Sequence, residues 1–143
     1  ADEDKIGHVG LEESLRLIAY GLNLTLTEVR NTIDPMIASD DKQLAVGLMR
    51  RGEVSGLHQT SNGLTKEGVP IELDLTMSVD AEQRDTITLE TEELGLIELV
   101  IPGGIFGDTA TVNVVVNTAK TMYACEESGL LTMADIRLTR NAG

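Results

Sequence analysis

The stretch IPGGIFGDTATVNVVVN, from Ile101 to Asn117, decides how the fold is interpreted. A β-like run leads into it and stops at Pro102, and glycines follow at Gly103, Gly104 and Gly107. Asp108 and Thr109 then open a segment in which apolar residues recur at helical spacing. Those residues are Val112, Val115, Val116, Ala119, Met122 and Tyr123. The order of elements is therefore strand, glycine turn and helix.

This glycine corner allows two interpretations. Glycine permits a tight turn and the close approach of a ligand, and the first N–H groups of a helix lack partners inside the helix, which favours an anion there. The structural alternative is a plain corner in which Asp108 only caps the helix. From the pattern alone we favour the plain corner, because such short motifs discriminate poorly.

Two nucleotide-binding motifs are excluded at the corner. A P-loop requires Lys after its last glycine, but Gly107 is followed by Asp108, whose carboxylate would repel phosphate. The dinucleotide fingerprint requires G-x-G-x-x-G within a βαβ unit, and the chain has G-G-x-x-G without one. We therefore expect no cofactor-binding residue in this chain, and a ligand other than a nucleotide phosphate if one binds here.

Composition narrows the class of protein further. The chain has 143 residues, so it fits a single domain, 1–143, whose core must be aliphatic because aromatic residues make up only 2%. Its net charge of −13 argues against nucleic acid or a membrane surface as a partner, since both attract clusters of Lys and Arg. No apolar run is long enough for a transmembrane helix. The one cysteine, Cys125, cannot form an internal disulfide, which favours a reducing, cytoplasmic location.

The first half of the chain predicts a helix, a strand and a second helix. Apolar residues from Leu11 to Leu22 share one helical face, and Gly21 marks the end of that helix. From Leu24 to Ile33, a capping-box pattern competes with alternation of β-branched residues, and we predict a strand that Pro35 ends or that lies at a sheet edge. Asp40 to Arg51 has acids first and arginines last, which predicts a helix ending before Gly52.

The second half has the character of a sheet. Strands are predicted at 54–60, 71–79, 86–91 and 93–101, with turns at Asn62-Gly63 and at Gly68. Carboxylates alternate with apolar residues from Ile71 to Val79, which is typical of a strand with one solvated face. No His or Cys joins these carboxylates, so we expect no metal site. The tail SGLLTMADIRL predicts a short turn and an edge strand.

A polar stripe runs beside the apolar face of the last helix. Its members, four residues apart, are Thr109, Asn113, Asn117 and Thr121. Amides and hydroxyls here, in place of Lys and Glu, indicate partial burial against a ligand, a subunit or another domain. The sum of the elements is an α+β fold: a mostly antiparallel or mixed sheet of four to six strands with two main helices on one face.

The order of five motifs resembles a known family. They are GHVGLEESL, DPMIA, RGEVSGLHQT, GGIFGDTAT with VVN, and SGLLTMADI. In this order they are similar to the C-terminal domain of dihydrodipicolinate reductase-like dehydrogenases, closest to the 2,4-diaminopentanoate dehydrogenase branch. The resemblance implies a two-domain NAD(P)-dependent oxidoreductase whose N-terminal Rossmann domain, absent from this chain, holds the NAD or NADP. The start at a residue other than Met agrees with a fragment.

The resemblance also implies where substrate binds. His8 and Gly10 would lie near the substrate cleft, and Gly103, Gly104, Asp108 and Thr109 would form its opposite lip. The reductases proper carry a His-His…Lys motif followed by Pro-Ser-Gly-Thr, and this sequence has neither, which argues against dihydrodipicolinate as the substrate. An amino acid or amine suits the acidic chain better, because Asp108 could pair with its ammonium group.

Three classes of function remain open. The first is the substrate-binding and oligomerisation domain of a nicotinamide-dependent dehydrogenase, a dimer or tetramer that is inactive without its other half. The second is a non-catalytic assembly or ligand-binding module with a structural glycine corner. The third, a stand-alone enzyme, is the weakest, because His8, His58 and Cys125 do not compose a nucleophile–base pair by their spacing.

Overall fold

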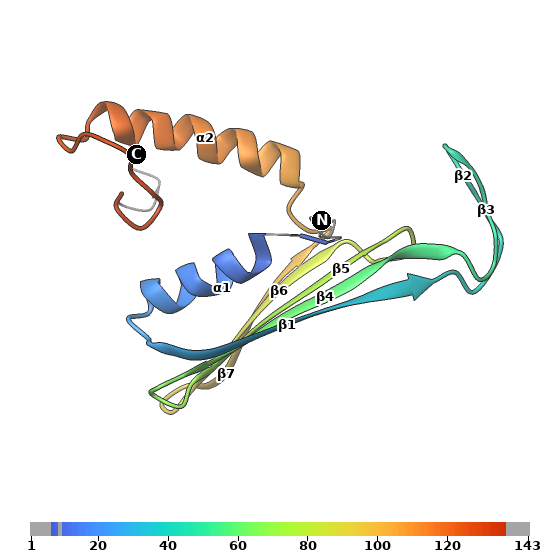
Figure 1. Ribbon diagram of the computed structural model, residues 1–143, viewed down its shortest axis with the longest axis horizontal. Helices are drawn as coiled ribbons and strands as arrows, with labels where there is room; N and C mark the ends of the chain where they lie inside the picture. The colour runs from blue at the N-terminus through green and yellow to red at the C-terminus, as the bar shows by residue number, and fades with distance from the viewer. Residues whose placement is uncertain (1–6, 9, 137–143) are drawn as a thin grey trace, which may run out of the picture. The chain divides into compact units, whose positions relative to one another are not determined.

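The computed structural model describes residues 7, 8 and 10–136 and divides into two compact units, within 1–81 and 82–143, which we describe separately (Figure 1). The elements in chain order are α1 (Gly10–Gly21), β1 (Leu26–Ile37), β2 (Lys42–Leu44), β3 (Gly47–Met49), β4 (Val54–Thr65), β5 (Pro70–Ser78), β6 (Arg84–Thr91), β7 (Gly95–Pro102) and α2 (Gly107–Tyr123). All of the strand pairs in this described part are antiparallel, so the predicted α+β class is confirmed.

Helix α1 forms as the apolar spacing predicts. Leu15 and Ala19, four residues apart, are its buried residues, and they face the sheet of the first unit. The helix ends at Gly21, but Asn23 makes the turn, with a left-handed φ of 56°. The Leu24 N–H donates to the carbonyl of Ala19 at 2.8 Å, and the Asn23 N–H donates to that of Tyr20 at 3.0 Å. This pair of bonds is the Schellman arrangement, which satisfies the last carbonyl groups of the helix.

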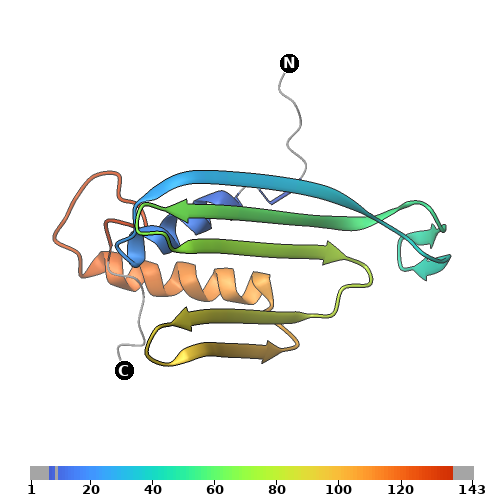
Figure 2. The same ribbon diagram turned by 90° about the horizontal axis from the view of Figure 1, so that it is seen from below.

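The first unit is built on a three-stranded sheet in the order β1-β4-β5 (Figure 2). In the register, Ser61 of β4 lies opposite Asn31 of β1 and Leu73 of β5. One face of the sheet receives α1, and the core there comprises Leu15, Ala19 and Ile71, with Leu24, Leu26, Val29 and Leu73 packed against it. Since β1 is an edge strand that continues through Pro35, that proline lies at an edge.

The opposite face of this sheet is polar and solvated, as the alternation in β5 predicted. Glu72, Asp74 and Thr76 are exposed, whereas Ile71 on the other face is buried. Across the strands of this polar face, His58 Nε2 lies 2.8 Å from a carboxylate oxygen of Asp74. The charged side chains of this face are therefore solvated, and His58 and Asp74 also contact each other.

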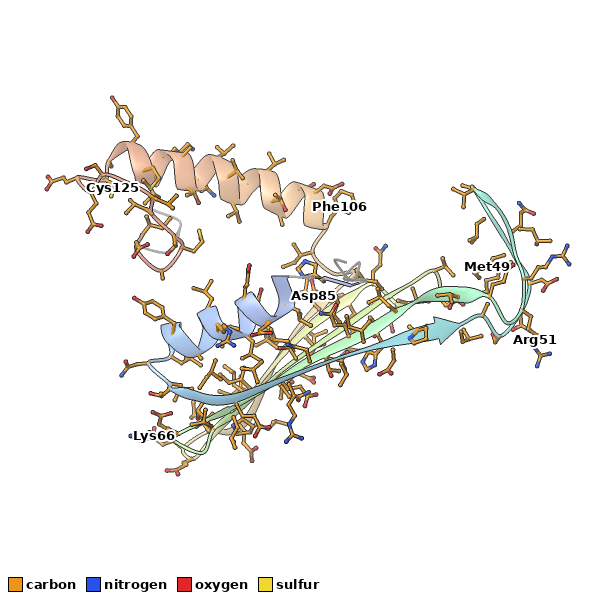
Figure 3. All side chains as sticks on the ribbon, in the orientation of Figure 1. Met49, Arg51, Lys66, Asp85, Phe106 and Cys125 are labelled. Carbon is orange, nitrogen blue, oxygen red and sulfur yellow. The ribbon has the colours of Figure 1, made fainter. Side chains whose placement is uncertain are left out.

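The helix predicted from Asp40 to Arg51 is wrong, because the segment forms the small antiparallel pair β2–β3. Gly47 adopts a φ of 136°, a value that no helical residue takes. The acids serve the loop instead: the Asp41 carboxylate accepts the Arg51 N–H at 2.8 Å, and Lys42 forms an ion pair with Asp80. Met49 is the one buried apolar residue of β2–β3 among those described, so no helical face is formed (Figure 3).

The turn predicted at Asn62-Gly63 is also wrong, because both residues lie inside β4. The glycine at position 63 is explained by the close packing of two leucine side chains and not by a turn. A Cβ at Gly63 would stand 2.8 Å from both Leu15 Cδ2 and Leu26 Cδ2. The turn at Gly68 is confirmed, with a φ of 81° and an N–H that donates to the Thr65 carbonyl at 3.0 Å.

The second unit contains a two-stranded ribbon, β6–β7, and helix α2. Both strands were predicted, although β7 starts at Gly95 and not at Glu93. The short turn of the tail is confirmed at Thr132–Asp135, where the Asp135 N–H donates to the Thr132 carbonyl at 3.1 Å. The edge strand expected in the same tail is not formed among its described residues, 128–136, and residues 137 and 138 lie outside the described part.

The expectation of a single sheet of four to six strands is wrong for the described part of the chain. The strands divide into one three-stranded sheet and two two-stranded pairs. Strands β2 and β3 pair only with each other because they lie in the long excursion between β1 and β4, beyond the end of the main ladder. Neither described helix is long and apolar enough to cross a membrane.

Candidate functional site

The glycine corner between β7 and α2 requires two of its glycines for conformational reasons. Gly103 and Gly104 adopt φ values of 81° and 67°, in the left-handed region that other residues avoid. The Gly104 N–H donates to the carbonyl of Ile101 at 3.1 Å, which closes the turn. Gly107 has an ordinary φ and begins α2. The corner is therefore sharp because of two consecutive left-handed residues.

A carboxylate of the chain itself holds this corner in place. Asp85, at the start of β6, accepts the backbone N–H of Ile105 at 2.6 Å. A short bond to an ionised acceptor is among the stronger hydrogen bonds in proteins. Asp85 pairs with Ile101 in the ribbon register, and Figure 3 labels it below Phe106. The sequence analysis missed Asp85, because its partner Ile105 is 20 residues away along the chain and the contact leaves no local pattern.

Asp108 is not the helix cap. The N-cap residue of α2 is Phe106, with φ −67° and ψ 112°, and no side chain caps the helix. Asp108 lies in the first turn instead, where the positive end of the helix dipole stabilises its negative charge. The expectation that Asp108 caps α2 is therefore wrong, because the extended residue that ends the corner comes two positions earlier.

The polar stripe of α2 is open along most of its length. Thr109, Asn113 and Asn117 are exposed, and Thr121 is half-buried with its hydroxyl donating to the Asn117 carbonyl at 3.1 Å. Since the stripe begins at Thr109, it continues from the glycine corner along one side of the helix. It offers hydroxyl and amide groups that a ligand or a second domain can reach.

His8 and Gly10 lie together at the start of α1, in the first unit. The side-chain amide of Gln59 holds the main chain of His8 from both sides: Oε1 accepts the His8 N–H at 2.7 Å, and Nε2 donates to the His8 carbonyl at 3.1 Å. Gln59 is only 6% exposed. The His8 ring lies against Gly10, where a Cβ would come within 3.1 Å of His8 Cε1. Gln59 is a positioning residue that sequence reasoning missed.

The candidate residues thus form two groups. His8 and Gly10 belong to the first unit, and the other six, from Gly103 to Asn117, belong to the second. Within each group the members are adjacent in the chain or share one helix side, so the structure brings each group together. Asp85 and Gln59 each tie one group to a strand.

The glycine corner does not fit the pyrophosphate of a dinucleotide. One of its N–H groups is already bound by the Asp85 carboxylate, and Asp108 adds a second negative charge in the first turn of α2. Two carboxylates near the corner favour a cation such as an ammonium group. Among residues 7, 8 and 10–136, no group of three or more His, Cys, Asp or Glu side chains is arranged to hold a metal ion.

Comparisons with known proteins identify relatives of this fold. The family model described as the 2,4-diaminopentanoate dehydrogenase C-terminal domain matches residues 1–142. Among solved structures, the chain is similar to an amine dehydrogenase from Mycobacterium smegmatis, with a TM-score of 0.73 and 22% sequence identity over 90% of this chain. The match spans 38% of the length of that relative. A search of curated proteins found no match.

Proposed function

Because the chain belongs to the family of 2,4-diaminopentanoate dehydrogenase C-terminal domains, whose model matches residues 1–142, we propose that it is the substrate-binding and oligomerisation part of an NAD(P)-dependent oxidoreductase. The substrate is an amino acid or an amine. The family match carries this proposal, and the negative charge around the glycine corner supports the substrate class.

Asp108 binds the ammonium group of the substrate in this proposal. It stands in the exposed first turn of α2, three residues after the N–H that Asp85 accepts, in a chain of net charge −13. Thr109, Asn113 and Asn117 follow along the helix with hydroxyl and amide groups for the other polar atoms of an amino acid. His8 and Gly10 remain candidate substrate contacts of the first unit, at the start of α1, with the His8 main chain held by Gln59.

An N-terminal Rossmann domain outside this chain holds the NAD or NADP. The two carboxylates at the glycine corner support this assignment, since a phosphate would meet repulsion there. The isolated chain therefore does not bind NAD(H) or NADP(H) tightly and is inactive alone. Isothermal calorimetry on the chain checks this, and micromolar binding of either cofactor would contradict the domain assignment.

The substitution Asp108→Asn in the full-length enzyme tests the substrate proposal. It removes a charge-assisted hydrogen bond to an ammonium group, which contributes about 1.5–3 kcal/mol. We expect kcat/KM for the amine to fall about ten- to hundredfold, since each 1.36 kcal/mol is a factor of ten. Tm should hardly move, because Asp108 makes no capping bond. Unchanged kinetics in a folded Asn variant would mean that the corner is structural.

The full-length protein is a cytoplasmic homodimer or homotetramer in this proposal. One face of the β6–β7 ribbon supports assembly, since Ile87, Leu89, Ile97 and Leu99 are 52%, 51%, 39% and 57% exposed. The same face favours the alternative function, a non-catalytic assembly module. Sedimentation at tens of micromolar that detects only monomer would contradict both, whereas an oligomer without any amine oxidation would leave the alternative.

A further inference from the structure

The ladder between β6 and β7 ends just before the glycine corner. The last pair in its register is Arg84 with Pro102, and a proline has no N–H to donate. Beyond this pair, one hydrogen bond among the described residues ties the corner, residues 103–106, back to β6. It is the bond from the Ile105 N–H to Oδ2 of Asp85, at 2.6 Å. Asp85 thus continues the contact between β6 and the chain after the ladder has stopped.

The corner also packs on the start of β6. A Cβ at Gly104 would lie 3.4 Å from the backbone nitrogen of Arg84 and 3.6 Å from Oδ2 of Asp85. Since Gly104 has a left-handed φ of 67°, its conformation also favours glycine. All of these residues belong to the second unit, so the contacts do not involve the first unit.

Helix α2 begins directly after this corner without a side-chain cap. Phe106 is its N-cap residue, and the first bond of the helix runs from the Ala110 N–H to the Phe106 carbonyl at 3.0 Å. Asp108 lies in the first turn, three residues after Ile105. Because no side chain caps the helix, the bond at Ile105, one residue before the N-cap, sets where the helix begins relative to β6.

We propose that Asp85 is a positioning residue for substrate binding, because it sets the place of the first turn of α2 and therefore of the Asp108 carboxylate. This inference rests on the proposed function, in which Asp108 binds the ammonium group. Asp85 itself is engaged with the chain, through the Ile105 N–H. A hydrogen bond weakens steeply when its angle is poor, so a displaced Asp108 binds the ammonium group less tightly. The loss falls on KM, because it weakens the binding of substrate and transition state alike.

The test is a double-mutant cycle in the full-length enzyme, with Asp85→Ala, Asp108→Asn and the two combined. The matched control is Asp135→Ala, since Asp135 accepts the N–H and the hydroxyl of Thr132, each at 2.7 Å, in the turn that follows α2. We expect Asp85→Ala to raise KM for the amine about tenfold with kcat little changed, as for the loss of one hydrogen bond to a charged group. The combined variant should have the KM of Asp108→Asn alone, because Asp85 acts through Asp108. Asp135→Ala should keep the wild-type kinetics.

Asp85→Asn separates the position of Asp108 from the charge of Asp85. The amide oxygen of asparagine accepts the same N–H without a charge, and such neutral bonds are about half as strong, so KM should rise only about threefold. A rise in the Asn variant as large as that in Asp85→Ala would mean that the charge attracts the substrate directly, which overturns the positioning role. Should Asp85→Ala fail to fold, Asp85→Asn takes its place in the cycle.

Two further results would overturn the proposal. One is an additive rise in KM in the combined variant, and the other is an Asp85→Ala variant that behaves like Asp135→Ala. An Asp108→Asn variant with wild-type kinetics refutes the proposed ammonium site, and this inference with it. An impaired Asp108→Asn beside a normal Asp85→Ala refutes this inference alone.

Discussion

Replacing Gln59 with leucine tests whether one buried amide positions the start of α1. The side chain is 6% exposed and makes two hydrogen bonds to the main chain of His8, at 2.7 and 3.1 Å. Leucine keeps the volume and removes both bonds. At about 0.5–1.5 kcal/mol for each bond, the loss is about 1–3 kcal/mol. For a chain of this length that corresponds to a fall in Tm of about 3–9 °C.

Thermal unfolding followed by circular dichroism measures the effect, with Gln43→Leu as the matched control. The Gln43 side chain is exposed and donates only to the adjacent Leu44 carbonyl at 3.2 Å, so its loss should cost less than about 0.5 kcal/mol. In the full-length enzyme, Gln59→Leu should also raise KM for the amine, because His8 loses its support. A Tm within 1 °C of the wild type, with normal kinetics, would refute the view that Gln59 positions His8.

Four further substitutions test the packing and the charges of the first unit. Ser61 is fully buried and its hydroxyl has no hydrogen-bond partner among the described residues, so Ser61→Ala should stabilise the fold by about 1 kcal/mol in urea unfolding. Gly63→Ala should cost about 1–3 kcal/mol, since its Cβ would crowd two leucines, whereas Gly21→Ala meets no atom within 4 Å and should raise Tm slightly. The backbone N–H of Thr25 holds the pKa of Glu67 below its ordinary value of 4.5, so the stabilisation is complete above pH 4.5 and is lost as the pH falls through the lower folded value. Glu67→Gln should therefore flatten the dependence of Tm on pH in that acidic window, and an unchanged slope would count against this hydrogen bond.

Elements with a strong local period were predictable from the sequence. The apolar spacing of α1, the alternation of β5 and the valines of α2 each repeat often enough to specify the element. The glycines before α2 identified the sharp corner as well, because consecutive left-handed residues favour Gly103 and Gly104. The motif order also supported the family that the comparison with residues 1–142 confirms.

The secondary structure of short segments depended on contacts with residues elsewhere in the chain. Acids followed by arginines suit a helix and the β2–β3 pair equally well, and the φ of Gly47 separates the two. The Asn62-Gly63 dipeptide has the signature of a turn, but α1 packs so closely on β4 that a Cβ at Gly63 would crowd Leu15 and Leu26. Tertiary packing therefore contributes more to the free energy of the fold than the local preference of these residues for a turn.

The supports of the candidate site have no local signature at all. Gln59 is 51 residues from His8, and Asp85 is 20 residues from Ile105, so neither hydrogen bond leaves a pattern along the chain. The sequence by itself determined helices α1 and α2, most of the strands, the acidic character and the candidate residues that we propose a substrate contacts. Only the tertiary structure decided which side chains hold them, because a hydrogen bond depends on distance in space and not on separation along the chain.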